Sequence, residues 1–221
     1  MESIRKIYKI GLGPSSSHTM GPRIAAEKFR QRNELAKSIR ITLYGSLAAT
    51  GKGHLTDKVL RESFPEDKVR IIWEKDTILP QHPNGMKFEA LDDKGKLLDD
   101  WVVFSVGGGD IEDSEIKAQK VKIYPHSKMT DILKWCQQNG RTLWEYVELH
   151  EGEEIWEFLA AIWKTMKASV VLGLENEGVL PGILHLPRKA SSYYIKAKSS
   201  AGTLQKRALL FAYALAVSEE N

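Results

Sequence analysis

Hydrophobic and polar positions alternate in three short, β-rich segments of the first half of the chain. The strands predicted from this pattern cover residues 39–44, 68–73 and 101–106, and Gly, Pro or Asp clusters close each of them. Between the first two, residues 48–62 begin with glycines and continue with apolar positions at helical spacing, which predicts a helix. The order strand, helix, strand indicates an α+β domain, similar to an α/β unit, over residues 1–110.

Another helix is predicted before the first strand, from Pro22 to about Asn33. Proline is tolerated at the first helical position, and Ile24, Ala25 and Phe29 recur on one face of this segment. The segment directly follows a loop rich in Gly, Ser and Thr. We therefore expect that loop to lie at the N-terminus of the helix.

The pattern changes after three successive glycines at positions 107–109. Residues 111–127 are charged and poor in aromatic side chains, which predicts a linker with a brief β-like stretch at 121–124. From residue 128 to residue 221 the apolar positions have helical period, enough for about four helices. Residues 204–217 are apolar on most sides, which is typical of a helix buried all round. We expect a partner chain or further sequence to cover this helix.

Composition narrows the class of protein. The 221 residues are 42% hydrophobic and 28% charged, as in globular proteins, and the net charge of +3 is spread along the chain, which argues against nucleic acid as the main partner. No apolar run is long enough for a membrane helix and no secretory segment is seen, so we expect a cytoplasmic protein and no membrane partner. The single cysteine, Cys136, excludes an intramolecular disulfide framework and is predicted to be a buried core thiol.

The densest polar cluster is the loop Gly13-Pro14-Ser15-Ser16-Ser17-His18-Thr19-Met20-Gly21-Pro22. Three hydroxyls and free N–H groups at a helix start can hold a carboxylate or phosphate, but the loop matches neither a P-loop nor a dinucleotide fingerprint. The alternative is an N-cap with a Ser/Thr turn, in which one hydroxyl satisfies helix donors. His18 favours a catalytic role of this loop over a simple cap, because an imidazole among hydroxyls can transfer a proton near neutral pH.

Two other histidines lie in glycine or proline loops. His54 follows Gly51-Lys52-Gly53, and His82 lies two residues before Asn84 in a proline-rich loop, on the same side of the chain if the loop is extended. Each could simply bond to the backbone of its own loop, but three loop histidines suggest a shared site. Surface or helix-end positions are predicted for the others, His126, His150 and His185. No spacing typical of a zinc or calcium site occurs.

Five blocks occur in order along the first half: Gly13-Pro14-Ser15-Ser16-Ser17-His18-Thr19, Leu43-Tyr44-Gly45-Ser46-Leu47-Ala48, Gly51-Lys52-Gly53-His54, His82-Pro83-Asn84 and Ser105-Val106-Gly107-Gly108-Gly109. Together they resemble the β-chain domain of the iron–sulfur-dependent bacterial L-serine dehydratases, or L-serine ammonia-lyases. Two further blocks, Glu177 to Gly182 with Arg188-Lys189-Ala190 and Tyr213 to Asn221, resemble the beginning of the catalytic α-chain domain. The resemblance thus covers essentially the whole chain.

This resemblance implies an organisation and an activity. Residues 1–110 would form a β domain like the allosteric substrate-binding domains of some phosphoglycerate dehydrogenases, residues 111–127 a linker, and residues 128–221 the incomplete all-α beginning of the catalytic domain. The implied enzyme is a homodimeric lyase of amino-acid degradation and gluconeogenesis that converts L-serine to pyruvate and ammonia. In that family three cysteines hold a 4Fe-4S cluster, whose open iron acts on the substrate while an imidazole takes the Cα proton.

The resemblance also implies roles for individual residues. His18 and His54 match candidate proton-transfer positions, and the sequence does not rank one above the other. The surrounding substrate shell is matched by Ser15, Ser16, Ser17, Thr19, His82 and Asn84.

The sequence departs from the family pattern in its metal ligands. The family's cluster cysteines and its Thr-Asn-Gly segment lie downstream of the Glu-Glu-Asn block, where this sequence ends, and Cys136 alone cannot hold a cluster. We therefore expect the chain to bind no cluster and to be inactive by itself, with a missing segment or a partner α chain supplying the rest. A smaller departure is Ile183, which stands where a second glycine is expected.

Two alternatives compete with the lyase. A non-catalytic module that senses serine would explain the missing cysteines equally well. A pyridoxal-phosphate lyase would act on the same substrate, but no Schiff-base lysine or phosphate cup stands out.

Overall fold

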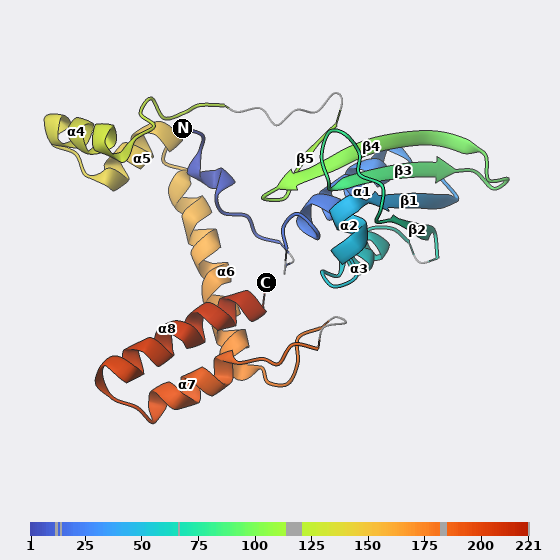
Figure 1. The fold of residues 1–221 in the computed structure, drawn as a ribbon. Coiled ribbons are helices and arrows are strands. Elements are labelled where there is room, and N and C mark those ends of the chain that lie inside the picture. Colours follow the sequence, from blue (N-terminus) through green and yellow to red (C-terminus); the bar gives the residue numbers. More distant parts are fainter. Residues whose placement is uncertain (12, 14, 66, 114–120, 182–184, 221) are drawn as a thin grey trace. The chain divides into compact units, whose positions relative to one another are not determined.

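The computed structural model describes residues 1–11, 13, 15–65, 67–113, 121–181 and 185–220 (Figure 1). Contacts divide the chain into two units, Met1–Ile10 with Gln119–Ala168 and Gly11–Ala118 with Ser169–Asn221. Pro14, Ile183 and part of the predicted linker lie outside the described residues. None of the helices in the described ranges combines the length and apolar character of a membrane span.

A five-stranded sheet with the order β2-β1-β3-β4-β5 forms the centre of the Gly11–Ala118 segment. The strands are β1 (Ser38–Tyr44), β2 (Val69–Glu74), β3 (Gly85–Leu91), β4 (Leu97–Gly107) and β5 (Asp110–Glu112). Strands β1 and β2 pair in parallel, as the order strand, helix, strand requires, and the other pairs are antiparallel. The three predicted strands and the α+β class are confirmed.

The sequence pattern missed strands β3 and β5. In β3 the apolar side chains of Met86, Phe88 and Ala90 are buried, but Glu89 is also only 8% exposed. Its carboxylate accepts two hydrogen bonds, of 2.7 and 2.8 Å, from the guanidinium of Arg40 on β1. Lys87 and Glu89 alternate with these apolar residues, so β3 does carry the period-two pattern of a strand, which the sequence analysis did not use.

Three helices accompany the sheet: α1 (Met20–Arg32), α2 (Gly45–Thr50) and α3 (Thr56–Glu62). Helix α1 packs Phe29 against Phe88 of β3 and Trp101 of β4, with ring centroids 5.3 and 6.4 Å apart. The single helix predicted over residues 48–62 is instead two short helices. Leu55 has φ of +61°, a left-handed conformation that interrupts helical geometry and separates α2 from α3.

Outside the sheet and its three helices, the regular elements of the described residues are helices, as predicted from residue 128 onward. The helices are η1 (Ile4–Lys6), α4 (Met129–Asn139), α5 (Leu143–Glu151), α6 (Ile155–Glu175), α7 (Ala190–Lys198) and α8 (Gly202–Glu219). Five of them lie in the described part of residues 129–219, where four were expected. The β-like stretch at 121–124 forms no strand; the N–H groups of Ile123 and Tyr124 donate to the carbonyl of Met1 at 3.0 and 3.1 Å.

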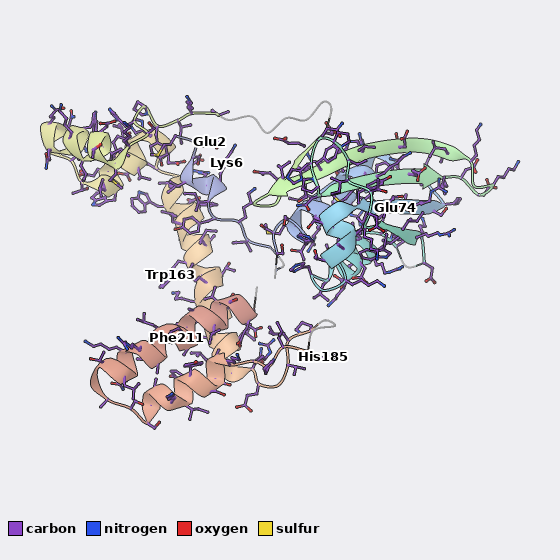
Figure 2. The ribbon with its side chains drawn as sticks, viewed as in Figure 1. Glu2, Lys6, Glu74, Trp163, His185 and Phe211 are labelled. Atoms are coloured by element: carbon purple, nitrogen blue, oxygen red, sulfur yellow. The ribbon has the colours of Figure 1, made fainter. Side chains whose placement is uncertain are left out.

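Residues 204–217, which were expected to need a partner chain or further sequence to be buried all round, are buried on one face only among the described residues. In α8 the buried side chains are the small ones, Ala208, Ala212 and Ala216, whereas Phe211 is 56% exposed (Figure 2). These alanines recur every four residues and form one narrow face. That face packs closely, because a Cβ added to Gly173 of α6 would lie 2.5 Å from the Cα of Ala216. Large apolar side chains on the other faces stay exposed.

A buried carboxylate ties the N-terminal residues to α5 within the Met1–Ile10 and Gln119–Ala168 unit. Glu151, whose side chain is 2% exposed, accepts hydrogen bonds from the Tyr124 hydroxyl at 2.6 Å, the Ser3 hydroxyl at 2.7 Å and the Ile4 N–H at 2.7 Å. Burial raises its pKa, but these hydrogen bonds outweigh that effect and hold the pKa below its usual range. Cys136 is buried in the same unit, as predicted.

Candidate active site

The strand register brings several loops to one edge of the sheet. Leu43 pairs with Met86 and Gly85 pairs with Phe104, so the end of β1, the beginning of β3 and the end of β4 lie together. These ends connect to α2, to the His82–Asn84 loop and to Ser105. The N-terminus of α1 reaches the same edge, since a Cβ added to Gly21 would collide with the Ser105 hydroxyl. Sequence blocks far apart in the chain therefore meet here.

His18 lies at the centre of this edge and is only 8% exposed. Its Nδ1 is 3.0 Å from the Ser17 Oγ and 3.2 Å from the Ser15 Oγ, and its Nε2 is 3.0 Å from the Thr50 Oγ1. The backbone is also fixed, because the Thr56 hydroxyl donates to the His18 carbonyl at 2.7 Å. Both ring nitrogens thus have hydroxyl partners within hydrogen-bond distance.

His54 joins His18 as predicted. The two ring centroids are 4.7 Å apart with planes tilted by 47°. The Nδ1 of His54 is buried and has no hydrogen-bond partner among the residues that the structure describes. A buried nitrogen without a partner is unfavourable unless a ligand or water satisfies it. The pair therefore offers one imidazole engaged with hydroxyls and one with a free nitrogen.

His82 and Asn84 reach the site through the backbone rather than directly. The Nδ1 of His82 accepts the Asn84 N–H at 3.1 Å, and the Asn84 carboxamide donates to the Ser105 carbonyl at 3.3 Å. The intervening Pro83 carbonyl accepts the Ser46 N–H at 3.1 Å. Within the described residues no ring contact joins His82 to His18 or His54. The Asn84 Oδ1 and the Ser105 hydroxyl are buried and find no hydrogen-bond partner within the described part of the chain, so both could bind a ligand or water.

The hydroxyls of the Ser-rich loop divide into two groups. Those of Ser15 and Ser17, 3.3 Å apart, face the imidazole of His18. Thr19 is fully buried and its hydroxyl donates back to the Ser15 carbonyl at 2.7 Å, while Ser16 contributes its carbonyl to the Gly21 N–H at 3.0 Å. Thr19 is the N-cap of α1 but makes no side-chain capping bond. The structure therefore favours an imidazole with two serines over a simple cap.

Burial is the main influence on the His18 imidazole. It lowers the pKa of His18 below its ordinary value, and the nearby His54 lowers it further, whereas a hydrogen bond to the Ser46 carbonyl raises it. A histidine with a lowered pKa is neutral at neutral pH and can accept a proton.

Stability should fall as the pH falls through the ordinary histidine pKa. Burial also lowers the pKa of His150, with His126 adding to the effect. Because His18 and His150 bind protons less readily in the folded chain than in the unfolded chain, the free energy of unfolding should decrease from about pH 8 to about pH 5.5. Carboxylates with lowered pKa, such as Glu151, add to the loss only at lower pH.

Urea unfolding across this pH range measures the effect. His18→Asn should make the dependence on pH shallower. An unfolding free energy that is constant or rises toward pH 5.5 would contradict the burial of these imidazoles.

Sequence reasoning missed three hydroxyl residues of this site: Thr50, Thr56 and Ser105. Thr50 lies one turn after Ser46 and just before the Gly51-Lys52-Gly53-His54 block, which was the signal available. The prediction of one helix over residues 48–62 gave no indication that Thr50 contacts His18. Ser105 was part of a recognised block but was not expected in the site.

The described residues do not fit an iron–sulfur cluster. Such a cluster needs several cysteine thiolates, whereas Cys136 is the only cysteine and its thiol lies within 3.7 Å of the Thr142 carbonyl. Within the same described ranges, no group of three or more His, Cys, Asp or Glu side chains could hold a metal ion. The groups that the described residues contribute to the site are imidazoles, hydroxyls and a carboxamide.

Comparison with known proteins points to one family. The profile of the family described as serine dehydratase beta chain matches residues 3–62 and 61–116, just over half of the chain. The chain is similar to an L-serine dehydratase of Haemophilus influenzae and to L-serine dehydratase 2 of Escherichia coli, each 32% identical over the whole chain. It is also 32% identical, over 99% of its length, to an L-serine dehydratase of Streptomyces coelicolor. The chain spans 60–61% of the length of these relatives.

Proposed function

Because the chain belongs to the serine dehydratase beta chain family, we propose that it contributes the histidine and serine loops of an L-serine ammonia-lyase. The observation that carries this proposal is the pairing of His18 with His54, 4.7 Å apart, beside the Ser15 and Ser17 hydroxyls. Relatives named L-serine dehydratase support the choice of L-serine as substrate.

The reaction removes water from L-serine across its Cα–Cβ bond. A base takes the Cα proton, the β-hydroxyl leaves as water after gaining a proton, and the resulting enamine is hydrolysed to pyruvate and ammonia. His18 and His54 are the candidate bases, because both are imidazoles at this edge and burial keeps His18 neutral. The structure supports no ranking of the two for this step.

The other residues of the site would bind and orient the substrate. Hydroxyls of Ser15 and Ser17 can hydrogen bond to a carboxylate or an amino group, and the N-terminus of α1 next to them favours an anion. The unpartnered Asn84 Oδ1 can accept a hydrogen bond from a ligand, for which a substrate ammonium group is suitable. Ser16, Thr19 and His82 remain predicted members of the substrate shell through the loops they hold.

The complete enzyme would need groups that the described residues do not supply. We propose an iron–sulfur enzyme whose cluster cysteines come from a further segment or an α chain, assembled as a homodimer. Support for additional protein comes from large apolar side chains that stay exposed here, including Trp163 of α6 and Phe211 of α8 at 58% and 56% (Figure 2). The greater length of the relatives is consistent with this proposal.

The experiment is an anaerobic assay of pyruvate release from L-serine, with the chain combined with the polypeptide that supplies the cluster cysteines. Pyruvate and ammonia formed in equal amounts are the expected result. No turnover in a cluster-loaded complex would overturn the lyase proposal.

A second candidate is a non-catalytic module that binds serine, favoured by the lack of fit between the described residues and a metal cluster. Calorimetry of the chain with L-serine separates the two. Saturable binding together with a cluster-loaded complex that never releases pyruvate indicates the sensor, whereas pyruvate release indicates the lyase.

A further inference from the structure

The hydroxyl of Thr50 contacts both the Ser46 carbonyl and a ring nitrogen of His18. Thr50 is the last residue of α2 and lies four residues after Ser46, so its hydroxyl donates to the Ser46 carbonyl at 2.9 Å. The same Oγ1 is 3.0 Å from the Nε2 of His18. A carbonyl oxygen only accepts, so the single hydroxyl hydrogen of Thr50 is committed to Ser46 and its oxygen lone pairs remain for the imidazole.

We propose that Thr50 is a positioning residue that holds His18 in the tautomer protonated at Nε2, which makes Nδ1 the basic nitrogen. With its hydrogen donated elsewhere, Thr50 can only accept at Nε2, and an accepted bond requires an N–H there. Nδ1 then carries the lone pair, which accepts from the hydroxyl of Ser17 at 3.0 Å or from that of Ser15 at 3.2 Å.

This assignment deepens the proposed function and rests on it for its role in catalysis. A proton that His18 accepts arrives at Nδ1, on the side of the two serine hydroxyls, and the imidazolium formed then donates from both nitrogens. Its Nε2–H remains on Thr50 and its new Nδ1–H faces Ser15 or Ser17, whose oxygens can accept. Fixing the tautomer through the second nitrogen is how partners of imidazole bases orient them.

Nitrogen NMR of the histidine-labelled chain tests the proposal. In the unaltered chain near neutral pH, the Nδ1 resonance of His18 should fall in the range of an unprotonated ring nitrogen and the Nε2 resonance in the range of a protonated one. In Thr50→Val, which keeps the shape but removes the hydroxyl, the two resonances should move toward each other as the second tautomer becomes populated. Because Thr50 is exposed, this substitution should leave the fold intact.

Two controls make the result specific. Thr50→Ser keeps the hydroxyl and should restore the pattern of the unaltered chain. Thr165→Val removes a comparable exposed helical threonine, whose hydroxyl donates to the Ala161 carbonyl at 3.1 Å, and should leave His18 unchanged. A protonated Nδ1 in the unaltered chain, or an unchanged His18 in Thr50→Val, would overturn the proposal. The readout needs no turnover, so failure of the lyase proposal would appear separately, in the pyruvate assay.

Discussion

Replacing His18 with asparagine is expected to lower pyruvate release from L-serine by about 10²–10⁴-fold in the cluster-loaded complex. Asparagine retains a hydrogen-bonding side chain of similar length but cannot accept a proton at neutral pH. It would also leave the Ser15 and Ser17 hydroxyls without the imidazole that they now face. The rate of pyruvate formation at saturating L-serine measures the loss.

The matched control is His185→Asn, at an exposed position on a loop of the other half of the chain. This variant should retain the turnover of the unaltered chain. If His18→Asn retained it as well, His18 would not be a proton-transfer residue and the role would have to fall to His54 alone.

Replacing Glu151 with alanine is expected to lower the free energy of unfolding by about 2–4 kcal/mol. The substitution removes a buried charged acceptor and leaves three donors unsatisfied, the hydroxyls of Ser3 and Tyr124 and the N–H of Ile4. Burial and the hydrogen bond to Glu151 both raise the pKa of Tyr124, so its hydroxyl remains a donor at all moderate pH values. Urea unfolding followed by tryptophan fluorescence measures the loss.

Glu154→Ala is the control for this prediction, because the Glu154 side chain is 86% exposed and pairs, among the described residues, with Arg5 at 3.9 Å. An exposed pair of this kind should contribute less than about 1 kcal/mol. Amide exchange adds a local readout: protection of the Ile4 N–H should be lost in Glu151→Ala and kept in Glu154→Ala. Equal effects of the two substitutions would show that Glu151 does not hold the N-terminal residues.

The elements that could be predicted from the sequence are those whose apolar residues recur at regular helical or strand spacing. Strand β1 and helix α1 have buried side chains at regular spacing, and both were expected close to their observed bounds. Strand β3 was not predicted, although its apolar residues alternate with Lys87 and Glu89 in the pattern of a strand. Those two charged residues pair with each other and with Arg40 of β1 and Asp100 of β4. The apolar segment of α8 indicated that the helix needs cover but not what provides it, and the described residues leave Phe211 exposed.

The site was predicted in its residue types and only partly in its geometry. Local sequence showed a histidine within a serine cluster, and the structure confirms that His18 and His54 meet. Long-range contacts such as that between Thr50 and His18 depend on how α2 follows β1, which no local pattern specifies. His82 behaves as the alternative interpretation from local sequence predicted. Its ring nitrogen accepts a hydrogen bond from the nearby Asn84 N–H, as in an ordinary loop residue.

Titration of the histidine-labelled chain with L-serine, followed through all six imidazoles, tests most directly whether these loops form a serine site. We predict saturable shifts of the His18 and His54 resonances, smaller shifts of His82, and none for His126, His150 or His185. The same titration of His18→Asn should show weaker binding. Unmoved His18 and His54 resonances, or equal shifts of every imidazole, would contradict a serine site at this edge of the sheet.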